Sequence, residues 1–284
     1  MITTRFAPAP TGHLHLGHVV NALYVWETAR RESGRVLLRI EDHDRQRSRP
    51  EYEASILDDL AWLEFVPDEP MVRQSERTAM YEAALAQLRT AGLTYACDCS
   101  RRDIFEAGGA GVELRYPGTC QSKGLLDGPG RAVRLRLSRC EESFDDLLLG
   151  PQLQVPSEQC GDLLLRDRHG NWTYQFAVTV DDFDQGVDLV IRGIDLLQST
   201  GRQLQLARML GRSRPPRFMH HPLVMNSPQQ KLSKSNGATG IREMRARGMT
   251  PQAVCEGARR AASPAQLPTS NAQNPIWKLD FGGW

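Results

Sequence analysis

The 284-residue sequence has no excess of charge of either sign, no long apolar run and no repeat. It contains 35 lysine and arginine residues against 34 aspartate and glutamate residues, a net charge of +1. This balance argues against an indiscriminate polyanion binder, although it leaves room for local basic patches. No apolar stretch approaches the ~20 residues that span a bilayer, and the N-terminus lacks the charged-then-apolar order of a signal peptide. No internal repeat or low-complexity tract is present. We therefore expect a cytoplasmic protein that does not enter a membrane.

The length and the cysteine content indicate the number of domains and the chemical state of the cysteines. A chain of 284 residues can form one large α/β domain or two modest ones and can bury a substantial core. In a reducing cytosol, its six cysteines are expected to be thiols or metal ligands rather than disulfides. Three of them, Cys140, Cys160 and Cys255, have no partner at a useful spacing and are expected to be simple thiols.

The first motif lies at a turn near the N-terminus. Residues 2–6 fit a short buried strand, which ends at two prolines and a glycine. In residues 19–33, charged residues are interleaved with apolar ones in a pattern that indicates a helix. A strand that turns sharply into a helix exposes backbone N–H groups and the positive end of the helix dipole, which together favour phosphate. His15, Gly17 and His18 lie in this turn. On its own the motif is short, and two solvated histidines are the alternative interpretation.

The second motif is Lys231-Leu232-Ser233-Lys234-Ser235, in a polar stretch that begins after Pro228. It predicts a flexible loop with two ammonium groups, and a solvated basic loop is the alternative. The two motifs in this order resemble the signature sequences of class I aminoacyl-tRNA synthetases. The flanking segments Arg5-Phe6-Ala7-Pro8 and Arg39-Ile40-Glu41-Asp42 are similar to the glutamyl branch of that family.

The resemblance implies an α/β fold with a Rossmann-type parallel-sheet catalytic domain, a small zinc-bearing insertion and a short helical C-terminal segment. We expect the first half of the catalytic domain at residues 1–92, the insertion at 93–165, the second half at 166–240 and the C-terminal segment, without an anticodon-binding domain, at 241–284.

Apolar patterns place further elements of the sheet. Residues 35–40 predict a second parallel strand and residues 187–193 a later one, and the β-rich run at 172–182 is interpreted as a buried strand or its approach. Ligands of open α/β sheets lie beyond the carboxyl ends of the strands, where Glu41 and Arg192 are expected. A guanidinium at that place is suited to a bidentate hold on a carboxylate.

Cys97, Cys99, Tyr116 and Cys120 form a candidate metal site. Thiolates favour zinc, and four such groups can close a tetrahedral site. Spacing alone leaves loosely placed free cysteines as the alternative, because Cys-x-Cys is less diagnostic than Cys-x-x-Cys. In the family, this pattern is a zinc site, which implies a structural Zn²⁺ here.

The resemblance also implies the roles of the other residues. ATP is expected to bind at His15, Gly17, His18 and Lys234, with Mg²⁺, and the catalytic residues are expected to be His15, His18, Lys231 and Lys234. Arg5 and Arg192 would hold the two carboxylates of L-glutamate, Glu41 its ammonium group, and Tyr174 would close the pocket. The glutamate-binding loop is expected to contribute Phe6, Ala7, Pro8 and Ala9, with Ala9 standing where the family usually has serine.

The chain is short after residue 240, and this shortness, together with the cysteine pattern, most closely resembles the glutamyl-queuosine tRNA(Asp) synthetases. This implies activation of glutamate with ATP, without tRNA, and its transfer to queuosine in the anticodon of tRNA(Asp). Two alternatives stay open: a small glutamyl-tRNA synthetase that charges a tRNA 3′ end, and a non-catalytic paralogue that only binds. We expect a monomer. The residues leave open which queuosine hydroxyl is esterified and why glutamate would be preferred to aspartate.

Overall fold

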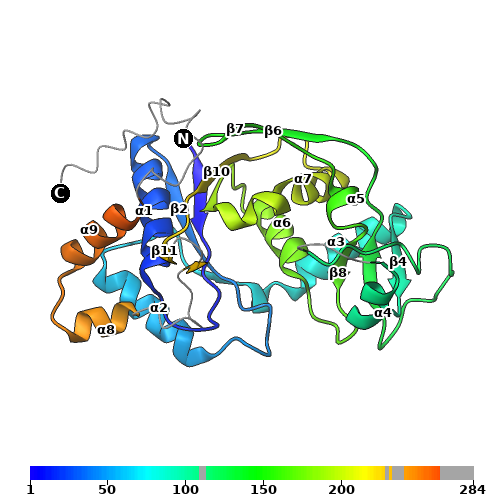
Figure 1. Cartoon of the computed structure of the whole chain (residues 1–284), viewed down its shortest axis with the longest axis horizontal. Coiled ribbons are helices and arrows are strands. Elements are labelled where there is room, and N and C mark those ends of the chain that lie inside the picture. The colour runs from blue at the N-terminus through cyan, green and yellow to red at the C-terminus, as the bar shows by residue number, and fades with distance from the viewer. Residues whose placement is uncertain (109–112, 228–229, 232–239, 263–284) are drawn as a thin grey trace.

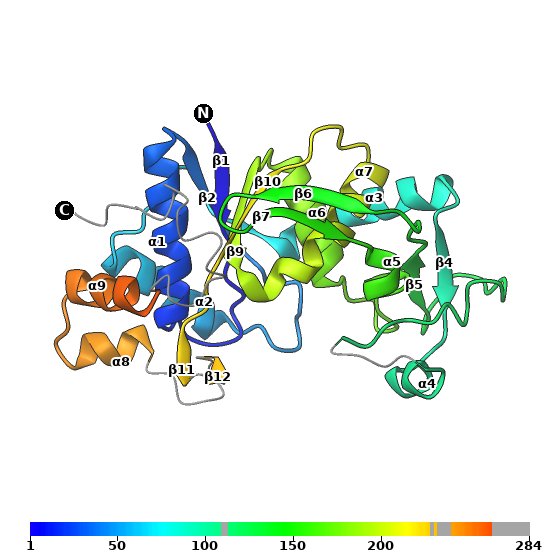
Figure 2. The ribbon, with the colours of Figure 1, turned by 45° about the horizontal axis from the view of Figure 1, so that its top comes forward.

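The structure, a computed structural model, describes residues 1–108, 113–227, 230–231 and 240–262. The molecule is elongated, with helices α8 and α9 at one end and α4 and strand β4 at the other (Figures 1 and 2). No helix within the described ranges is long and apolar enough to cross a membrane.

Two sets of parallel strands make up the centre of the molecule. They meet where the backbone N–H of Asp188 donates to the carbonyl of Thr3 at 3.0 Å, so that β9 lies beside β1. All the pairings within the sets are parallel except that of β7 with β6. This confirms the predicted α/β fold with a parallel sheet. In spatial order the strands are β3 (Val72–Arg73), β2 (Arg35–Ile40), β1 (Thr3–Phe6), β9 (Leu189–Gly193), β10 (Arg217–His221), β6 (Glu142–Asp146) and β7 (Gly150–Gln154).

Helices cover this sheet and bury its apolar residues. Strand β2 is buried from Val36 to Ile40, as expected for a parallel strand that is covered on both faces. α9 packs along α1 (Figure 1), with Val254 and Ala258 of α9 fully buried in the main core. The helices of this part are α1 (Leu16–Arg31), α2 (Pro50–Trp62), α7 (Thr200–Met209), α8 (Ile241–Ala246) and α9 (Pro251–Ala261), with 3₁₀ turns η1 (Gln74–Glu76) and η2 (Ile194–Ser199). Helix α3 (Thr78–Thr90) packs in a separate core, with Val133 and Leu165.

A second, antiparallel sheet lies towards the other end of the molecule. It contains β4 (Thr94–Cys97), β5 (Ala132–Leu135) and β8 (Leu163–Arg166), with the short helices α4 (Arg101–Glu106) and α5 (Pro156–Gln159) nearby. The predicted insertion at 93–165 thus supplies strands to both sheets, because β6 and β7 pair with the catalytic strands. The division at residues 92, 165 and 240 stays a prediction.

The predicted strand at 172–182 is wrong, because residues Tyr174–Asp184 form helix α6. Its members from Phe176 to Asp182 are all buried, so no amphipathic period marks the helix in the sequence. A short, continuously apolar run does not distinguish a buried strand from a buried helix, and packing overrides the β preference of Val178, Thr179 and Val180. The predicted strand that follows is confirmed as β9.

Candidate active site

A cavity of about 340 Å³ opens at the carboxyl ends of β1, β2 and β9, where the parallel sheet predicts a ligand site. Loops that follow β1 and β2, the start of α6 and the end of β9 form its walls. Six of the residues predicted to bind glutamate line this cavity: Arg5, Ala7, Ala9, Glu41, Tyr174 and Arg192.

Two residues predicted to bind glutamate lie outside the described lining of the cavity. The ring of Phe6 is 1% exposed and packs against Trp26, with the ring centroids 5.5 Å apart. The carbonyl of Pro8 accepts a hydrogen bond from the N–H of Glu41 at 3.0 Å. Both residues thus fix the walls of the cavity by packing and backbone contact, and direct contact with glutamate stays a prediction.

Arg192 is a buried cation with neutral partners. Its guanidinium donates to His220 Nε2 at 3.0 Å, to Gln203 Oε1 at 2.7 Å and to Thr200 Oγ1 at 2.8 Å. These bonds use three of its five N–H groups. Tyr174 is a further hydrogen-bonding partner of the guanidinium, which a ligand would share. Within the described ranges no carboxylate lies at ion-pair distance, and burial lowers the pKa of Arg192. The described hydrogen bonds therefore fix the Arg192 guanidinium in position, and none of their acceptors carries a negative charge.

Arg5 faces the same cavity but shares an acidic partner. Its Nε lies 3.0 Å from Asp182 Oδ1, and that carboxylate also accepts from Arg39 Nη1 at 2.8 Å. Arg39 reaches Glu41 Oε1 as well, at 3.1 Å. Burial opposes ionisation of Asp182, but Arg5 and Arg39 outweigh it and lower its pKa. Burial raises the pKa of Glu41, against the opposing effects of Arg39 and Arg5.

Arg39 and Asp182, for which the sequence predicts no role, hold Arg5 and Glu41 in place. Arg39 is fully buried and also lies 3.6 Å from Asp181. The sequence does contain one signal that such ion pairs are needed. Asp181 and Asp182 end an apolar run, and buried carboxylates require hydrogen-bonding or cationic partners.

His15 and His18 form the N-terminal cap of α1. Nδ1 of His15 accepts from the N–H of Gly17 at 3.1 Å, and Nδ1 of His18 accepts from the N–H of His15 at 3.1 Å. Because each Nδ1 is an acceptor, the hydrogen of each neutral ring lies on Nε2. Two imidazole N–H donors thus accompany the backbone N–H groups at the positive end of the helix dipole.

Residues that follow the second motif in sequence contact the first motif through the backbone. His15 forms an antiparallel bridge with Gly240, and the N–H of Ile241 donates to the carbonyl of Leu14 at 3.0 Å. Lys231 ends β12 (Gln230–Lys231), which pairs with β11 (Met225–Ser227). Lys234 lies outside the described residues, so its predicted role stays a prediction.

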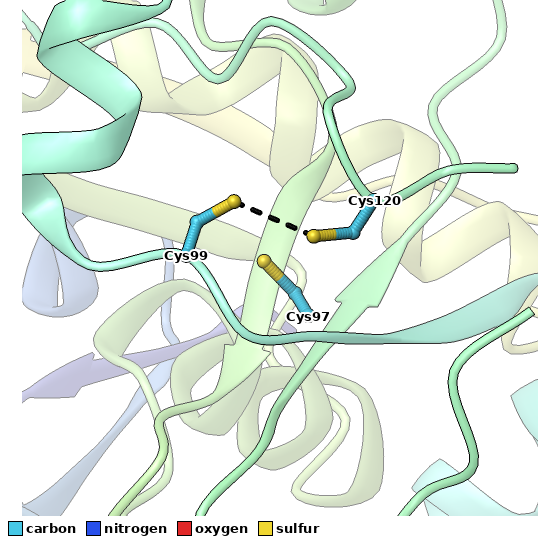
Figure 3. A group of neighbouring side chains, drawn as sticks. All are labelled: Cys97, Cys99 and Cys120. Atoms are coloured by element: carbon cyan, nitrogen blue, oxygen red, sulfur yellow. Dashed lines mark hydrogen bonds between the residues drawn. The ribbon is translucent and has the colours of Figure 1, made fainter. Parts of the chain in front are cut away.

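The three predicted thiol ligands come together between β4 and the loops beside it. The sulfur atoms of Cys97, Cys99 and Cys120 lie within 4.8 Å of one another and point towards a common centre (Figure 3). Tyr116 lies beside them, with its hydroxyl 3.5 Å from Cys97 Sγ and accepting the N–H of Cys120 at 2.8 Å. The group could hold a metal ion.

Three comparisons relate this geometry to known proteins. Residues 1–269 match the family described as tRNA synthetases class I (E and Q), catalytic domain. The Glutamyl-Q tRNA(Asp) synthetase of Burkholderia mallei is 46% identical over 244 residues, which cover 84% of this chain and 82% of that protein. The protein of the same name from Ralstonia nicotianae is 45% identical over 248 residues, 84% of this chain and 78% of that protein.

Longer relatives share the same core. Glutamate--tRNA ligase 1 of Acidithiobacillus ferrooxidans is 39% identical over 258 residues, 89% of this chain but 55% of that protein. A crystal structure of a glutamate tRNA ligase from Elizabethkingia meningosepticum, in complex with its amino acid, superposes with a TM-score of 0.77 at 27% identity. That match covers 95% of this chain and 62% of the other. The chain thus belongs to the class I tRNA synthetases of the glutamyl and glutaminyl branch.

Proposed function

We propose that this protein activates glutamate with ATP to glutamyl-adenylate and then transfers glutamate to queuosine in the anticodon of tRNA(Asp). The observation that carries the proposal is the charge pattern of the cavity, where two buried arginines and one buried glutamate line a space of about 340 Å³. Glutamate carries two carboxylates and one ammonium group. The relatives that match across more than three quarters of their length are named for this reaction.

The amino acid would occupy the buried part of this cavity. Arg192, which has no acidic partner within the described ranges, supplies an uncompensated charge for one carboxylate, and Arg5 supplies the second. Glu41 accepts the ammonium group, and Tyr174 closes the pocket. Charge-assisted hydrogen bonds of this kind fix orientation as well as affinity.

ATP would lie at the N-terminus of α1. The Nε2–H groups of His15 and His18 and the nearby backbone N–H groups donate to its phosphates. The glutamate carboxylate then attacks the α-phosphorus and pyrophosphate leaves, a step that depends on alignment and charge stabilisation. Lys231 and Lys234 would stabilise the departing charge, and Mg²⁺ would supply further compensation when bound.

The cysteine group fits a structural zinc ion. A tetrahedral Zn²⁺ with Zn–S bonds of about 2.3 Å places its sulfur ligands roughly 3.8 Å apart. Sγ of Cys99 and Sγ of Cys120 lie 3.4 Å apart, and all three sulfur atoms lie within 4.8 Å of one another. The hydroxyl of Tyr116 would complete the set. Four protein ligands leave no open position, so the metal would join β4 to the loop at Cys120 rather than activate water.

The test is transfer of labelled glutamate, with ATP, to tRNA from queuosine-replete and queuosine-deficient cells. The expected result is label on the replete tRNA alone. Oxidation of the queuosine diol with periodate before the reaction should abolish it, whereas protection of the 3′ end should not. Equal label on both pools would establish a glutamyl-tRNA synthetase of the ordinary kind. No label on either tRNA, with no glutamate-dependent ATP–pyrophosphate exchange, would leave the non-catalytic binding paralogue as the remaining alternative.

A further inference from the structure

His43 lines the candidate cavity but has no role in the binding scheme described above. It follows β2, two residues after Glu41, and its ring centroid lies 6.5 Å from that of Tyr174. Its side chain is partly exposed, whereas Arg5, Glu41 and Arg192 are 4%, 6% and 3% exposed. His43 therefore lies nearer to the solvent than the residues that would hold the amino acid.

A chain of buried polar groups fixes the orientation of this imidazole. Nδ1 of His43 lies 2.6 Å from Gln74 Oε1, and Gln74 Nε2 donates to Asp181 Oδ2 at 2.7 Å. Gln74 is 1% exposed and Asp181 is fully buried. The far end of the chain is fixed as well, because Asp181 accepts from Arg77 Nε at 2.7 Å and from the Tyr81 hydroxyl at 2.9 Å.

These contacts decide the tautomer of His43. A carboxylate paired with Arg77 only accepts hydrogen bonds, so Gln74 must present its NH₂ group to Asp181 and its carbonyl oxygen to His43. His43 Nδ1 must then donate, which leaves the lone pair of the neutral ring on Nε2. Within the part of the chain that the structure describes, no hydrogen bond engages this nitrogen. The tautomer is the reverse of that in His15 and His18.

The other ionisable groups around His43 are already paired. Glu41 accepts from Arg39 at 3.1 Å, and Asp44 lies 2.6 Å from Arg47 Nε. The Tyr174 phenol is kept protonated because burial raises its pKa. A neutral imidazole with a lone pair on Nε2 is thus the basic group best placed to meet a molecule that enters from the solvent side of the cavity.

We infer that His43 is the general base of the transfer step. This inference rests on the proposed function, in which the acceptor is a hydroxyl of the queuosine cyclopentenediol. The hydroxyl oxygen attacks the carbonyl carbon of glutamyl-adenylate and forms the ester C–O bond. The bond between that carbon and the phosphate oxygen breaks, AMP departs with the bonding pair, and the hydroxyl proton passes to Nε2 of His43. Asp181 and Gln74 act as positioning residues, because they hold the ring in the tautomer that can accept this proton.

A general base at His43 would affect only one of the two half-reactions. Adenylate formation transfers no proton to His43, because its nucleophile is an ionised carboxylate, whereas ester formation must remove one. A general base typically contributes about 10²- to 10⁴-fold to a rate. Substitution of His43 should therefore slow transfer to tRNA and leave glutamate-dependent ATP–pyrophosphate exchange almost unchanged.

His43→Asn is the sharpest variant. Its amide NH₂ can replace Nδ1–H as the donor to Gln74, while the acceptor at the Nε2 position is lost. We expect single-turnover transfer from enzyme-bound glutamyl-adenylate to queuosine-containing tRNA(Asp) to fall about 10²-fold, with exchange within about twofold of wild type. His169→Asn is the matched control, because His169 lies in the exposed turn after β8, and it should alter neither rate.

His43→Ala with added imidazole gives a second readout that a structural role would not affect. Free imidazole should restore part of the transfer rate of this variant and should have no effect on wild type or on His169→Asn. A parallel fall in exchange and transfer, or unchanged transfer in His43→Asn, would overturn the assignment. Transfer by wild type is measured on the same tRNA. If wild type transfers no glutamate, the proposed function is contradicted. If wild type and His43→Asn transfer glutamate at the same rate, only the role of His43 is contradicted.

Discussion

Replacing Arg192 with methionine removes the one buried guanidinium of the candidate cavity whose three described hydrogen bonds all go to neutral acceptors. A hydrogen bond between charged partners contributes about 1.5–3 kcal/mol. At about 1.4 kcal/mol per tenfold change, the KM for glutamate in ATP–pyrophosphate exchange should rise about 10- to 150-fold. The KM for ATP should hardly change, because the phosphates would lie at the N-terminus of α1.

The same substitution has opposing effects on stability. It relieves the cost of burying a cation that has no acidic partner within the described ranges. It also removes the guanidinium donor to Gln203, Thr200 and His220, at about 1–3 kcal/mol for each group that stays unsatisfied. His220 Nε2 keeps a neighbour that can donate, because Thr200 Oγ1 lies 3.3 Å away. We therefore expect the variant to fold and to lose the stabilisation by glutamate that thermal unfolding of wild type should show.

Arg212→Met is the matched control. Arg212 is half-buried and lies outside the described lining of the cavity. Its guanidinium donates to the backbone carbonyls of Arg214 at 3.0 Å, of Asp182 at 3.3 Å and of Val187, and to no side chain in these bonds. It should leave the KM for glutamate within about twofold of wild type, whereas Arg192→Lys should give an intermediate value because it keeps the charge and loses the planar fork. A KM for glutamate in Arg192→Met within about threefold of wild type would refute the reasoning.

Three further predictions concern the other parts of the site. By elemental mass spectrometry, wild type should hold about one zinc ion per chain, and Cys120→Ser should lose it. Cys160→Ser is the control and should keep the zinc ion. Wild type without metal would contradict the zinc assignment. Burial raises the pKa of Glu41, so its carboxylate is lost at a higher pH than that of an ordinary glutamate as the pH falls. The KM for glutamate should then rise about tenfold per pH unit below that pKa, and a KM that stays constant down to the ordinary glutamate pKa of about 4.3 would argue against Glu41 as the ammonium acceptor. His18→Ala removes both a helix cap and a phosphate donor, so the exchange rate should fall about 10²-fold with a stability loss of about 1 kcal/mol; an unaffected exchange rate would exclude the phosphate role.

The sequence could predict the elements whose signals are local. The strand of residues 35–40 followed by Glu41, and the turn with His15 at the start of a helix, both carry local composition and capping signals, and the structure contains both. The spacing of Cys97, Cys99 and Cys120 left free cysteines as an alternative, and the family resemblance, rather than the spacing, favoured the cluster that the structure forms.

Sequence could not predict features that depend on distant contacts. Helix α6 is buried along most of its length, so its composition resembles that of a strand. The ion pairs that join Arg5 and Arg39 to Asp182 span 177 and 143 residues of sequence, and nothing local indicates them. The orientation of His43 depends in the same way on Gln74 and Asp181, which lie 31 and 138 residues away in sequence.

The position of β1 between β2 and β9 has a consequence for synthesis on the ribosome. β1 is among the first segments to be made, yet its neighbour β9 ends at Gly193. At about 5–20 residues per second, roughly 10–40 s pass before the ribosome has joined Gly193 to the chain. Until Asp182 has been added, Arg5 has no such carboxylate to pair with, and until β9 is complete the cavity lacks Arg192. A nascent chain that stops before β9 would therefore contain the turn of His15 and His18 without a complete candidate cavity.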